Sequence, residues 1–521
     1  MDRKERRLLV HLPQHSQSYW RDTAKLKKFP PLDTSIHTEV GIVGGGITGI
    51  TTAYLLTKQN VKVTLIDANP ILKGTTGHTT AKITAQHGLI YDELIQHFGL
   101  EQATLYYKAM DEAKQFIENT VKELQIRCDY YQDNAFIYTN SDQWKNDLEK
   151  EKTAYDQLGI KSELLEAMPL QLPMKLALQM HNQAHFHPLK YLTALLEESV
   201  KNGLTVYENT VAVDIDNNSH LKPVIVTKEG HQITCNHIIS ASHFPFYDRD
   251  SFYFTRMYAE RAYVIGIQST DKYPGGMYIN AEAPTRSVRS TKWDGKELWL
   301  ISGENHKTGQ GKPTHEHFKS LQAFAEENFT VASYDYRWSA QDLTTLDKIP
   351  YIGYLKKSSP NILVATGFRK WGMTNGTAAA NILTELVMQI ENEYADLFDP
   401  SRFKADPTIK KFIQTNTDVA KQMIQGKLDN TNNQFDLEQL KTDQATVTRI
   451  NGKRSGVYKD TENQLHIVDT TCTHLKCEVE WNSGERTWDC PCHGSRFSYT
   501  GEVINGPANK PLKKMDPDKL N

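Results

Sequence analysis

A glycine-rich turn between a predicted strand and a predicted helix is the feature that most restricts the fold. Residues 38–70 read TEVGIVGGGITGITTAYLLTKQNVKVTLIDANP. A β-branched run leads into the glycines, a helical pattern follows over 47–58, and a second apolar run ends at Asp67. This order is typical of a β–α–β unit with parallel strands. We therefore predict an α/β domain of the Rossmann-like, FAD/NAD(P)-binding kind.

The glycines of this turn have the spacing Gly-x-Gly-x-x-Gly, and each has a physical role in binding a dinucleotide. Gly44 permits the tight turn, Gly46 lets the backbone approach a pyrophosphate, and Gly49 lets helix and strand pack closely. The N-terminus of the helix supplies unpaired N–H groups for the anion. Asp67 lies 18 residues beyond Gly49, where a carboxylate can accept hydrogen bonds from a ribose. The alternative is a packing turn without a ligand.

A second unusual stretch is CTHLKCEVEWNSGERTWDCPCHGSRF, from Cys472 to Phe497. It holds four of the six cysteines of the chain together with two histidines. The hooks Cys-x-His and Cys-x-x-His each present one thiolate and one imidazole. This set suits a tetrahedral zinc site, and it also suits a [2Fe–2S] cluster in which one iron takes two thiolates and the other takes two imidazoles.

Length and composition limit the class of protein. The 521 residues are too many for one hydrophobic core and indicate about two to four domains. The formal net charge of −3 gives no electrostatic reason to expect nucleic-acid binding. The sequence has neither an apolar run of about 18 residues nor the apolar centre of a signal peptide, so we expect no transmembrane segment and a cytoplasmic protein. There, clustered Cys and His indicate metal or redox chemistry.

Two further stretches carry a resemblance to a known family. NPILKGTTGHTTAKIT, after Asp67, and ATGFRKWGMTNGTAAA, late in the domain, resemble FAD-dependent oxidoreductases of the D-amino-acid oxidase and glycine oxidase type. The resemblance implies FAD as the cofactor. Cys128 and Cys235 lie outside the flavin motifs and are interpreted as core thiols, so we expect FAD to be bound without a covalent link. We find no second Gly-x-Gly-x-x-Gly between a strand and a helix, which argues against a flavin reductase that uses NADH.

The resemblance also implies which residues contact FAD. The loop after the acidic residue wraps the pyrophosphate and approaches the isoalloxazine, the late strand–Gly–helix returns to the flavin, and a β-strand offers backbone groups to the adenine. In this sequence these roles fall on Thr75, Thr76, His78, Thr79, Thr80 and Lys82, on Thr366, Gly367, Gly372, Met373 and Thr374, and on Val211 or Val213.

The substrate site is less clear from the sequence. Arg286 and Arg289 lie in APTRSVRS, and family members that take amino acids use an arginine to hold the substrate carboxylate. A solvated or salt-bridged pair is the more common role of such residues. Asp342, in RWSAQDLTTLDKIPYIG, resembles a position near the flavin and is interpreted as structural support. The sequence identifies no catalytic acid or base.

The segments CTHLKC and CPCHGS closely resemble the two cluster-binding loops of Rieske proteins. The resemblance implies a [2Fe–2S] cluster, a disulfide between the loops, and a serine hydrogen bond to the cluster. Phe497 stands where high-potential members have a tyrosine, and a missing donor should lower the reduction potential. The implied ligands are Cys472, His474, Cys490 and His493, the disulfide is Cys477–Cys492, and the serine is Ser495.

These readings together predict an α/β FAD-binding domain with an inserted antiparallel-sheet substrate domain (α+β), followed by an all-β Rieske domain. The predicted FAD-binding parts are about 38–90, 150–245 and 340–391, and the substrate domain is about 250–335. The predicted division of the chain is 1–37 as an N-terminal extension, 38–391 as the oxidoreductase, 392–435 as a linker and 436–521 as the Rieske domain.

We expect FAD to oxidise a small amine or amino-acid-like substrate and to pass electrons to the cluster and then to a separate acceptor, a protein carrier or a quinone. Peripheral contact with a membrane is compatible with this expectation. One alternative is an oxidase that reduces oxygen directly, with the Rieske domain as a docking or structural module. Another is a redox-sensing or binding protein that turns over no metabolite.

Overall fold

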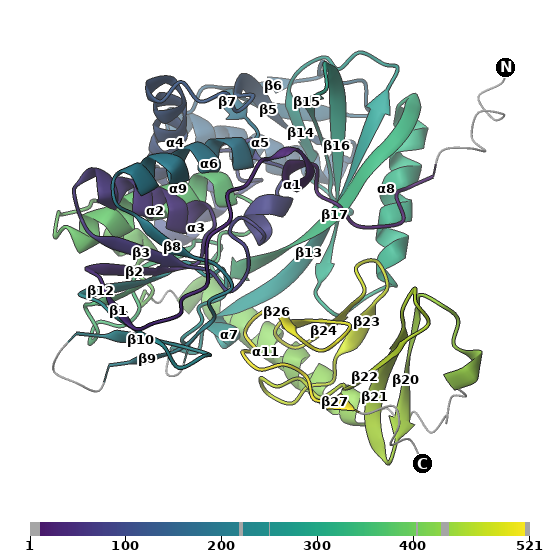
Figure 1. Ribbon diagram of the computed structural model, residues 1–521. Coiled ribbons are helices and arrows are strands. Elements are labelled where there is room, and N and C mark those ends of the chain that lie inside the picture. Colours follow the sequence, from purple (N-terminus) through teal and green to yellow (C-terminus); the bar gives the residue numbers. More distant parts are fainter. Residues whose placement is uncertain (1–10, 218–221, 249–250, 403–404, 429–436, 516–521) are drawn as a thin grey trace.

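The computed structural model describes residues 11–217, 222–248, 251–402, 405–428 and 437–515. It contains an α/β domain, a large sheet that continues from it, and a C-terminal all-β domain that packs against both (Figure 1). In the part of the chain that the structure describes, no helix has the length and hydropathy needed to cross a bilayer.

The α/β domain is built on a six-stranded sheet in the order β18-β19-β12-β2-β3-β8, in which only β18 is antiparallel to its neighbour. Helices cover one face, and a small sheet, β1-β11-β10-β9, packs on the other (Figure 1). Because both faces are covered, strands such as β2 are buried at every residue. The strands of the main sheet are β2 (Val40–Val43), β3 (Val63–Ile66), β8 (Thr205–Tyr207), β12 (His237–Ser240), β18 (Tyr351–Tyr354) and β19 (Ile362–Thr366); the small sheet has β1 (Ile36–His37), β9 (Ala212–Asp216), β10 (Val224–Thr227) and β11 (Gln232–Thr234); the helices are α2 (Ile47–Lys58), α6 (Pro188–Lys201) and α9 (Gly372–Val387).

The second sheet has nine strands and is larger than the predicted substrate domain. It also contains β4–β7, and the predicted division had assigned part of this region to FAD binding. These strands join the sheet because β14 pairs in parallel with β5, which lies about 140 residues earlier in the chain. Hydrophobic periodicity does not reveal such a distant pairing. The strands are β4 (Lys82–Ile83), β5 (Tyr131–Thr139), β6 (Ser162–Leu165), β7 (Leu176–His185), β13 (Met257–Ser269), β14 (Met277–Asn280), β15 (Arg286–Trp293), β16 (Lys296–Lys307) and β17 (Val331–Thr345); the helices around it are α3 (Tyr91–Phe98), α4 (Leu100–Glu123), α5 (Asp142–Gln157), α7 (Tyr253–Arg256) and α8 (Thr314–Asn328).

The N-terminal segment packs against the loop of residues 74–82. Helix α1 (Tyr19–Thr23) buries Trp20, whose Nε1 donates to the carbonyl of Thr79 at 2.7 Å. The hydroxyl of Ser18 donates to the carbonyl of Gly77 at 2.5 Å. The segment that the sequence marked only as an extension therefore holds this loop in place.

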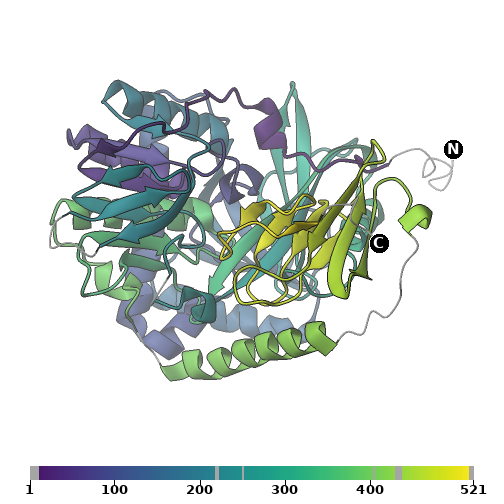
Figure 2. The ribbon, with the colours of Figure 1, turned by 60° about the horizontal axis from the view of Figure 1, so that its bottom comes forward.

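The predicted linker contains the short helix α10 (Ala395–Phe398) and the long helix α11 (Ala405–Leu428). Figure 2 shows α11 running along one edge of the molecule, from the α/β domain towards the C-terminal domain. Its Asn416 donates to the carbonyl of Thr255 at 3.2 Å, and Met423 packs against the C-terminal core. Helix α11 is therefore a packed element between the domains.

The C-terminal domain consists of two four-stranded antiparallel sheets, β20-β21-β22-β27 and β23-β24-β25-β26. Its core contains Val468, Trp488 and Phe497, all essentially inaccessible to solvent. The strands are β20 (Gln444–Ile450), β21 (Lys453–Lys459), β22 (Leu465–Asp469), β23 (Glu480–Asn482), β24 (Thr487–Asp489), β25 (Arg496–Ser498), β26 (Val503–Asn505) and β27 (Lys514–Met515).

Glu485, in the turn between β23 and β24, joins this domain to the large sheet. Its carboxylate forms ion pairs with Arg261 on β13 and with Arg496, and it accepts a hydrogen bond from Ser339 on β17. The side chain of Arg261 is 1% exposed and that of Glu485 is 12% exposed, so the pair is shielded from water. Burial opposes ionisation, but the two guanidinium groups hold the pKa of Glu485 at about 2.

We expect Glu485→Gln to lower the free energy of unfolding by about 3–5 kcal/mol, because it leaves Arg261 buried without its counter-charge. Urea unfolding of the full chain measures this change, and hydrogen exchange in β13 and β17 shows whether docking is loosened. Since the folded-state pKa lies below the ordinary 4.5, the stabilisation is complete above that pH and disappears as the pH falls toward 2.

The matched control is Glu480→Gln, because Glu480 is 49% exposed and pairs with Arg454 within the same domain. We expect a change below about 1 kcal/mol for this variant. Equal effects of the two substitutions would contradict the role assigned to Glu485.

Candidate functional site

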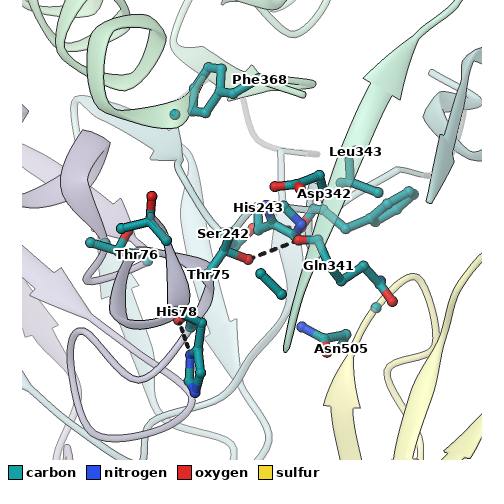
Figure 3. A pocket seen from close by; sticks show the side chains of 18 of the residues that line it. Thr75, Thr76, His78, Ser242, His243, Gln341, Asp342, Leu343, Phe368 and Asn505 are labelled. Atoms are coloured by element: carbon teal, nitrogen blue, oxygen red, sulfur yellow. Dashed lines mark hydrogen bonds between the residues drawn. The ribbon is translucent and has the colours of Figure 1, made fainter. Parts of the chain in front are cut away.

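A cavity of about 530 Å³ opens at the carboxyl ends of the parallel strands, where ligands bind in open α/β sheets. The β2–α2 turn, the 74–82 loop, the segment after β12 and the end of β17 form its walls (Figure 3). Residues 502–509 and Pro511 of the C-terminal domain complete the lining.

The glycine turn has the geometry that its sequence predicts. Gly44 has a φ of +118°, and a Cβ there would lie 2.4 Å from the carbonyl oxygen of Ala241. A Cβ at Gly49 would lie 1.9 Å from the carbonyl oxygen of Gly44, so this glycine permits the close helix–strand contact. Ile47 and Thr48, at the start of α2, line the cavity, where a helix N-terminus favours an anion such as a pyrophosphate.

Asp67 lines the same cavity at the end of β3. Its carboxylate accepts hydrogen bonds from the backbone N–H groups of Gly45 and Asn69, both at 2.8 Å. Burial raises the pKa of this carboxyl to about 6, although the two N–H groups partly oppose the shift. The hydrogen bond to Gly45 fixes the glycine turn relative to β3.

Most residues predicted to contact FAD lie on the cavity wall, and five do not. The five are held in contacts within the domain; for example, the hydroxyl of Thr366 donates to the carbonyl of His243 at 2.5 Å, and that of Thr374 donates to the carbonyl of Thr84 at 3.0 Å. The lining includes Gly44, Gly46, Asp67, Thr75, Thr76, His78, Thr79, Thr80, Lys82, Val211, Gly372 and Met373; the five outside it are Gly49, Val213, Thr366, Gly367 and Thr374.

Several cavity residues were missed by the sequence reading. Asp342 was interpreted as structural support, but it lines the cavity, and burial raises its pKa to about 7. His243 and Arg369 also line it, and each has a buried nitrogen without a hydrogen-bond partner in the described residues. Asp342 and Arg369 fall within the quoted family-like stretches, whereas no sequence signal pointed to His243. Unpartnered polar atoms around a cavity of this size fit a large polar cofactor such as FAD.

Arg286 and Arg289 do not line the cavity, in contrast to the suggested role in substrate binding. Arg286 forms an ion pair with Glu304 at 2.6 Å. Arg289 donates to the backbone carbonyls of Thr80 and Ser290 and lies over the ring of Trp20. Both guanidinium groups therefore stabilise the fold, which is the alternative that the sequence had left open.

Lys82 is a buried cation that lines the cavity. Its Nζ donates to the hydroxyl of Ser287 at 2.5 Å and lies 3.4 Å from the carbonyl of Tyr278. Burial lowers the pKa of this amine to about 7. The group can therefore change protonation near neutral pH, beside the large sheet.

Two thiols and two imidazoles converge in the C-terminal domain. Cys472 and Cys490 are buried and not disulfide-bonded, and the rings of His474 and His493 lie 5.0 Å apart. A hydrogen bond from Cys490, and then those from the backbone N–H of His474 and the hydroxyl of Ser495, lower the pKa of the Cys472 thiol, although burial opposes the shift. The Nδ1 atom of His474 is buried without a hydrogen-bond partner in the described residues. This donor set fits the two thiolate and two imidazole ligands of a [2Fe–2S] cluster.

A disulfide between Cys477 and Cys492 ties together the two loops that carry these ligands. The sulfur of Cys490 lies within 4.8 Å of both, so the disulfide borders the ligand set. Ser495 accepts a hydrogen bond from the backbone N–H of Ala508 at 3.0 Å, which leaves its hydroxyl proton free for a sulfur. The disulfide and the hydrogen bond from Ala508 therefore both hold the second cluster-binding loop in place.

Gln341 connects the two sites. Its backbone carbonyl, on the cavity wall, accepts a hydrogen bond from Thr75 at 3.1 Å (Figure 3). Its side-chain amide donates to the carbonyl of Gly494, next to His493, at 2.9 Å. Phe254 also reaches the ligand set: its ring centre lies 5.0 Å from that of His474 and 5.2 Å from that of His493. The cavity and the metal-ligand set therefore share one wall.

Comparison with known proteins assigns both parts of the chain. Residues 39–386 match the family described as FAD dependent oxidoreductase, and residues 433–516 match the Rieske [2Fe-2S] domain. The Rieske 2Fe-2S iron-sulfur protein YhfW of Bacillus subtilis is 49% identical over 96% of this chain and 98% of its own.

Two more distant similarities concern the first part alone. Gamma-glutamylputrescine oxidoreductase of Escherichia coli is 26% identical over 72% of this chain and 90% of its own. The crystal structure of glycine oxidase from Geobacillus kaustophilus covers 70% of this chain and 99% of its own, with a TM-score of 0.59 and 16% identity, and so shares the fold. This chain belongs to the FAD dependent oxidoreductase family, with FAD as its cofactor, and it carries a C-terminal Rieske domain for a [2Fe–2S] cluster.

Proposed function

We propose that the protein oxidises a small amine or amino-acid-like substrate and delivers the electrons through its Rieske domain to a separate acceptor. FAD supplies two-electron oxidation of a C–H bond next to nitrogen, and the [2Fe–2S] cluster supplies one-electron transfer. The observation that carries the proposal is the shared wall, in which Gln341 contacts both the 74–82 loop and the second cluster-binding loop.

The docking of the cluster-binding loops supports the relay because it is too close to admit a layer of water. A Cβ at Gly494 would lie 2.3 Å from the Cβ of Ala259. On the opposite side of the contact, a Cβ at Gly309 would lie 2.7 Å from the backbone nitrogen of Pro491. Contacts of this kind hold the loop in one position and shorten the distance that an electron must cross.

The cavity supports an amine-containing substrate. The relatives described above are named for glutamylputrescine and glycine, and each of these compounds contains an amine. An ammonium group must lose a proton before its carbon can release hydride. We assign this step to the carboxylate of Asp342, whose pKa of about 7 suits proton transfer near neutral pH. The unpartnered Nη1 of Arg369 is the group that we assign to a substrate carboxylate.

The direction of electron flow depends on the reduction potential of the cluster. Rieske centres have potentials of roughly −150 to +300 mV, above those of most flavins. Phe497 is buried in the same apolar cluster as Cys472 and Cys490 and has no hydroxyl to donate to a sulfur. We therefore infer a potential in the lower part of that range, which still favours transfer from FAD.

The proposal is tested by low-temperature EPR of the holoprotein, frozen after anaerobic mixing with a pool of small amines and amino acids. We expect the rhombic signal of a reduced Rieske cluster, as in a dithionite control. A flavin that bleaches while the cluster stays oxidised would contradict the relay. Rapid peroxide production that survives His474→Ala would favour the direct use of oxygen.

We expect Gln341→Leu to slow cluster reduction about tenfold relative to flavin reduction, because the loop at Gly494 loses its fixed position. Rapid-freeze EPR and stopped-flow absorbance measure the two rates in the same protein. Gln268→Leu is the control, since Gln268 also lies on the large sheet but bonds to Asp335 away from the cavity. An unchanged ratio of rates in Gln341→Leu would contradict the bridging role.

We expect Asp342→Asn to slow flavin reduction by an amine by about 10²–10⁴-fold, because the amide cannot accept the ammonium proton. In the wild type the rate should rise as the pH increases through about 7, where the carboxylate becomes ionised. Anaerobic stopped-flow absorbance as a function of pH checks both points, with Asp335→Asn as the control. If the step near pH 7 persists in Asp342→Asn, another group is responsible.

We expect Phe497→Tyr to raise the reduction potential of the cluster by roughly 20–65 mV, the one-electron equivalent of a hydrogen bond worth about 0.5–1.5 kcal/mol. The added donor stabilises the more negative, reduced form. A redox titration followed by EPR measures the shift. Tyr499→Phe serves as a control because Tyr499 stacks beside Tyr458, outside the ligand set. No shift, or a lower potential, would contradict the assignment.

A further inference from the structure

Helix α11 exposes four large apolar side chains, called here the apolar stripe. Ile409, Phe412, Ile413 and Ile424 are 48%, 40%, 60% and 58% exposed. At 100° per residue they fall within about 120° of the helix circumference, so they form one face. No other described helix exposes more than one large apolar side chain, so this group indicates an interaction surface.

The opposite side of α11 fixes its orientation. Lys411 pairs with Glu93 at 3.3 Å, and Asp418 pairs with Lys307 at 2.7 Å. Asn416, whose angular position falls among those of the stripe residues, bonds to the backbone of α7. These contacts join α11 to α3, to the end of β16 and to α7. Helix α11 therefore cannot roll to bury its apolar stripe without breaking them.

The charges beside the stripe are positive. Lys410, Lys421 and Lys427 are exposed, and between residues 407 and 427 the only acidic side chain is Asp418, which is half-buried in its ion pair with Lys307. Within residues 407–427 the exposed face thus combines branched and aromatic apolar groups with lysines and carries no exposed carboxylate. This combination is typical of helices that lie in a membrane interface with anionic lipids.

We propose that this face of α11 binds the surface of an anionic phospholipid bilayer, with the helix lying parallel to the membrane plane. A second copy of the chain fits the face less well, because a symmetric pairing would bring the same lysines of both copies together. The apolar stripe would enter the boundary between head groups and acyl chains, while the lysines would meet lipid phosphates.

This binding would place the Rieske domain beside the membrane. The backbone of Val419 contacts the sulfur of Cys492, and Met423 packs into the core that contains the cluster ligands. The thickness of one helix, about 10 Å, would then separate the disulfide-linked loops from the lipid. Together with the proposed relay, on which this last step rests, the geometry points to a lipid-soluble electron acceptor such as a quinone.

The test is co-sedimentation of the oxidised, full-length holoprotein with lipid vesicles. We expect binding to phosphatidylcholine vesicles containing about one quarter phosphatidylglycerol, and binding at least about tenfold weaker to phosphatidylcholine alone. Salt at about 0.5 M should weaken binding by screening the lysines. No substrate is present, so the outcome is independent of whether the proposed relay operates.

Two variants separate the apolar and charged contributions. We expect Ile413→Glu/Ile424→Glu to abolish vesicle binding and Lys410→Ala/Lys421→Ala to reduce it at least about tenfold for anionic vesicles. Leu100→Glu is the control, because Leu100 is a comparably exposed apolar residue on α4. Flavin absorbance and the EPR signal of the dithionite-reduced cluster verify that each variant is folded and loaded.

Three results would overturn the proposal. One is the absence of binding to anionic vesicles, and another is binding that the isoleucine variant retains. The third is a dimer that analytical ultracentrifugation detects in the wild type and that Ile413→Glu/Ile424→Glu dissolves, which would assign the stripe to a second copy of the chain.

Discussion

The buried carboxylate of Glu485 fixes the position of the Rieske domain on the large sheet. It lies between Arg261 of the large sheet and Arg496 of the Rieske domain, and it also accepts a hydrogen bond from Ser339. Because charges inside an interface must meet their partners, the Rieske domain has one favoured position on the sheet. The rest of the functional architecture depends on that position, since residues 502–509 complete the flavin cavity only when the domain is docked.

Docking turns two separate sites into one continuous structure. Gln341 bonds to the loop that borders the cavity and to the loop that carries His493, and Phe254 contacts the rings of both cluster histidines. The N-terminal segment contributes from the other side, since Trp20 holds the 74–82 loop by its carbonyl at Thr79. The segments that position the two cofactors therefore come from every part of the sequence.

Helix α11 has two faces with different roles. On its inner face Lys411 and Asp418 pair with Glu93 and Lys307, and so this face braces the docked arrangement. Its outer face is apolar and cationic. A single connecting segment thus both stabilises the pair of domains and, in our proposal, directs the Rieske domain toward a membrane.

The sequence by itself determined the features that are local in the chain. The turn from Gly44 to Gly49 and the pairs Cys472/His474 and Cys490/His493 depend on spacings of a few residues, so a dinucleotide site and a metal or cluster site could be predicted. The resemblance to known families then implied FAD and a [2Fe–2S] cluster. Only the tertiary structure decided the contacts between distant segments: that Glu485 meets Arg261, that Asp342 and Gln341 face the cavity, and that Arg286 is bound by Glu304 instead. Such contacts arise when strands far apart in the chain pair and pack, and the order of residues within one segment does not indicate which distant segment it will pair with.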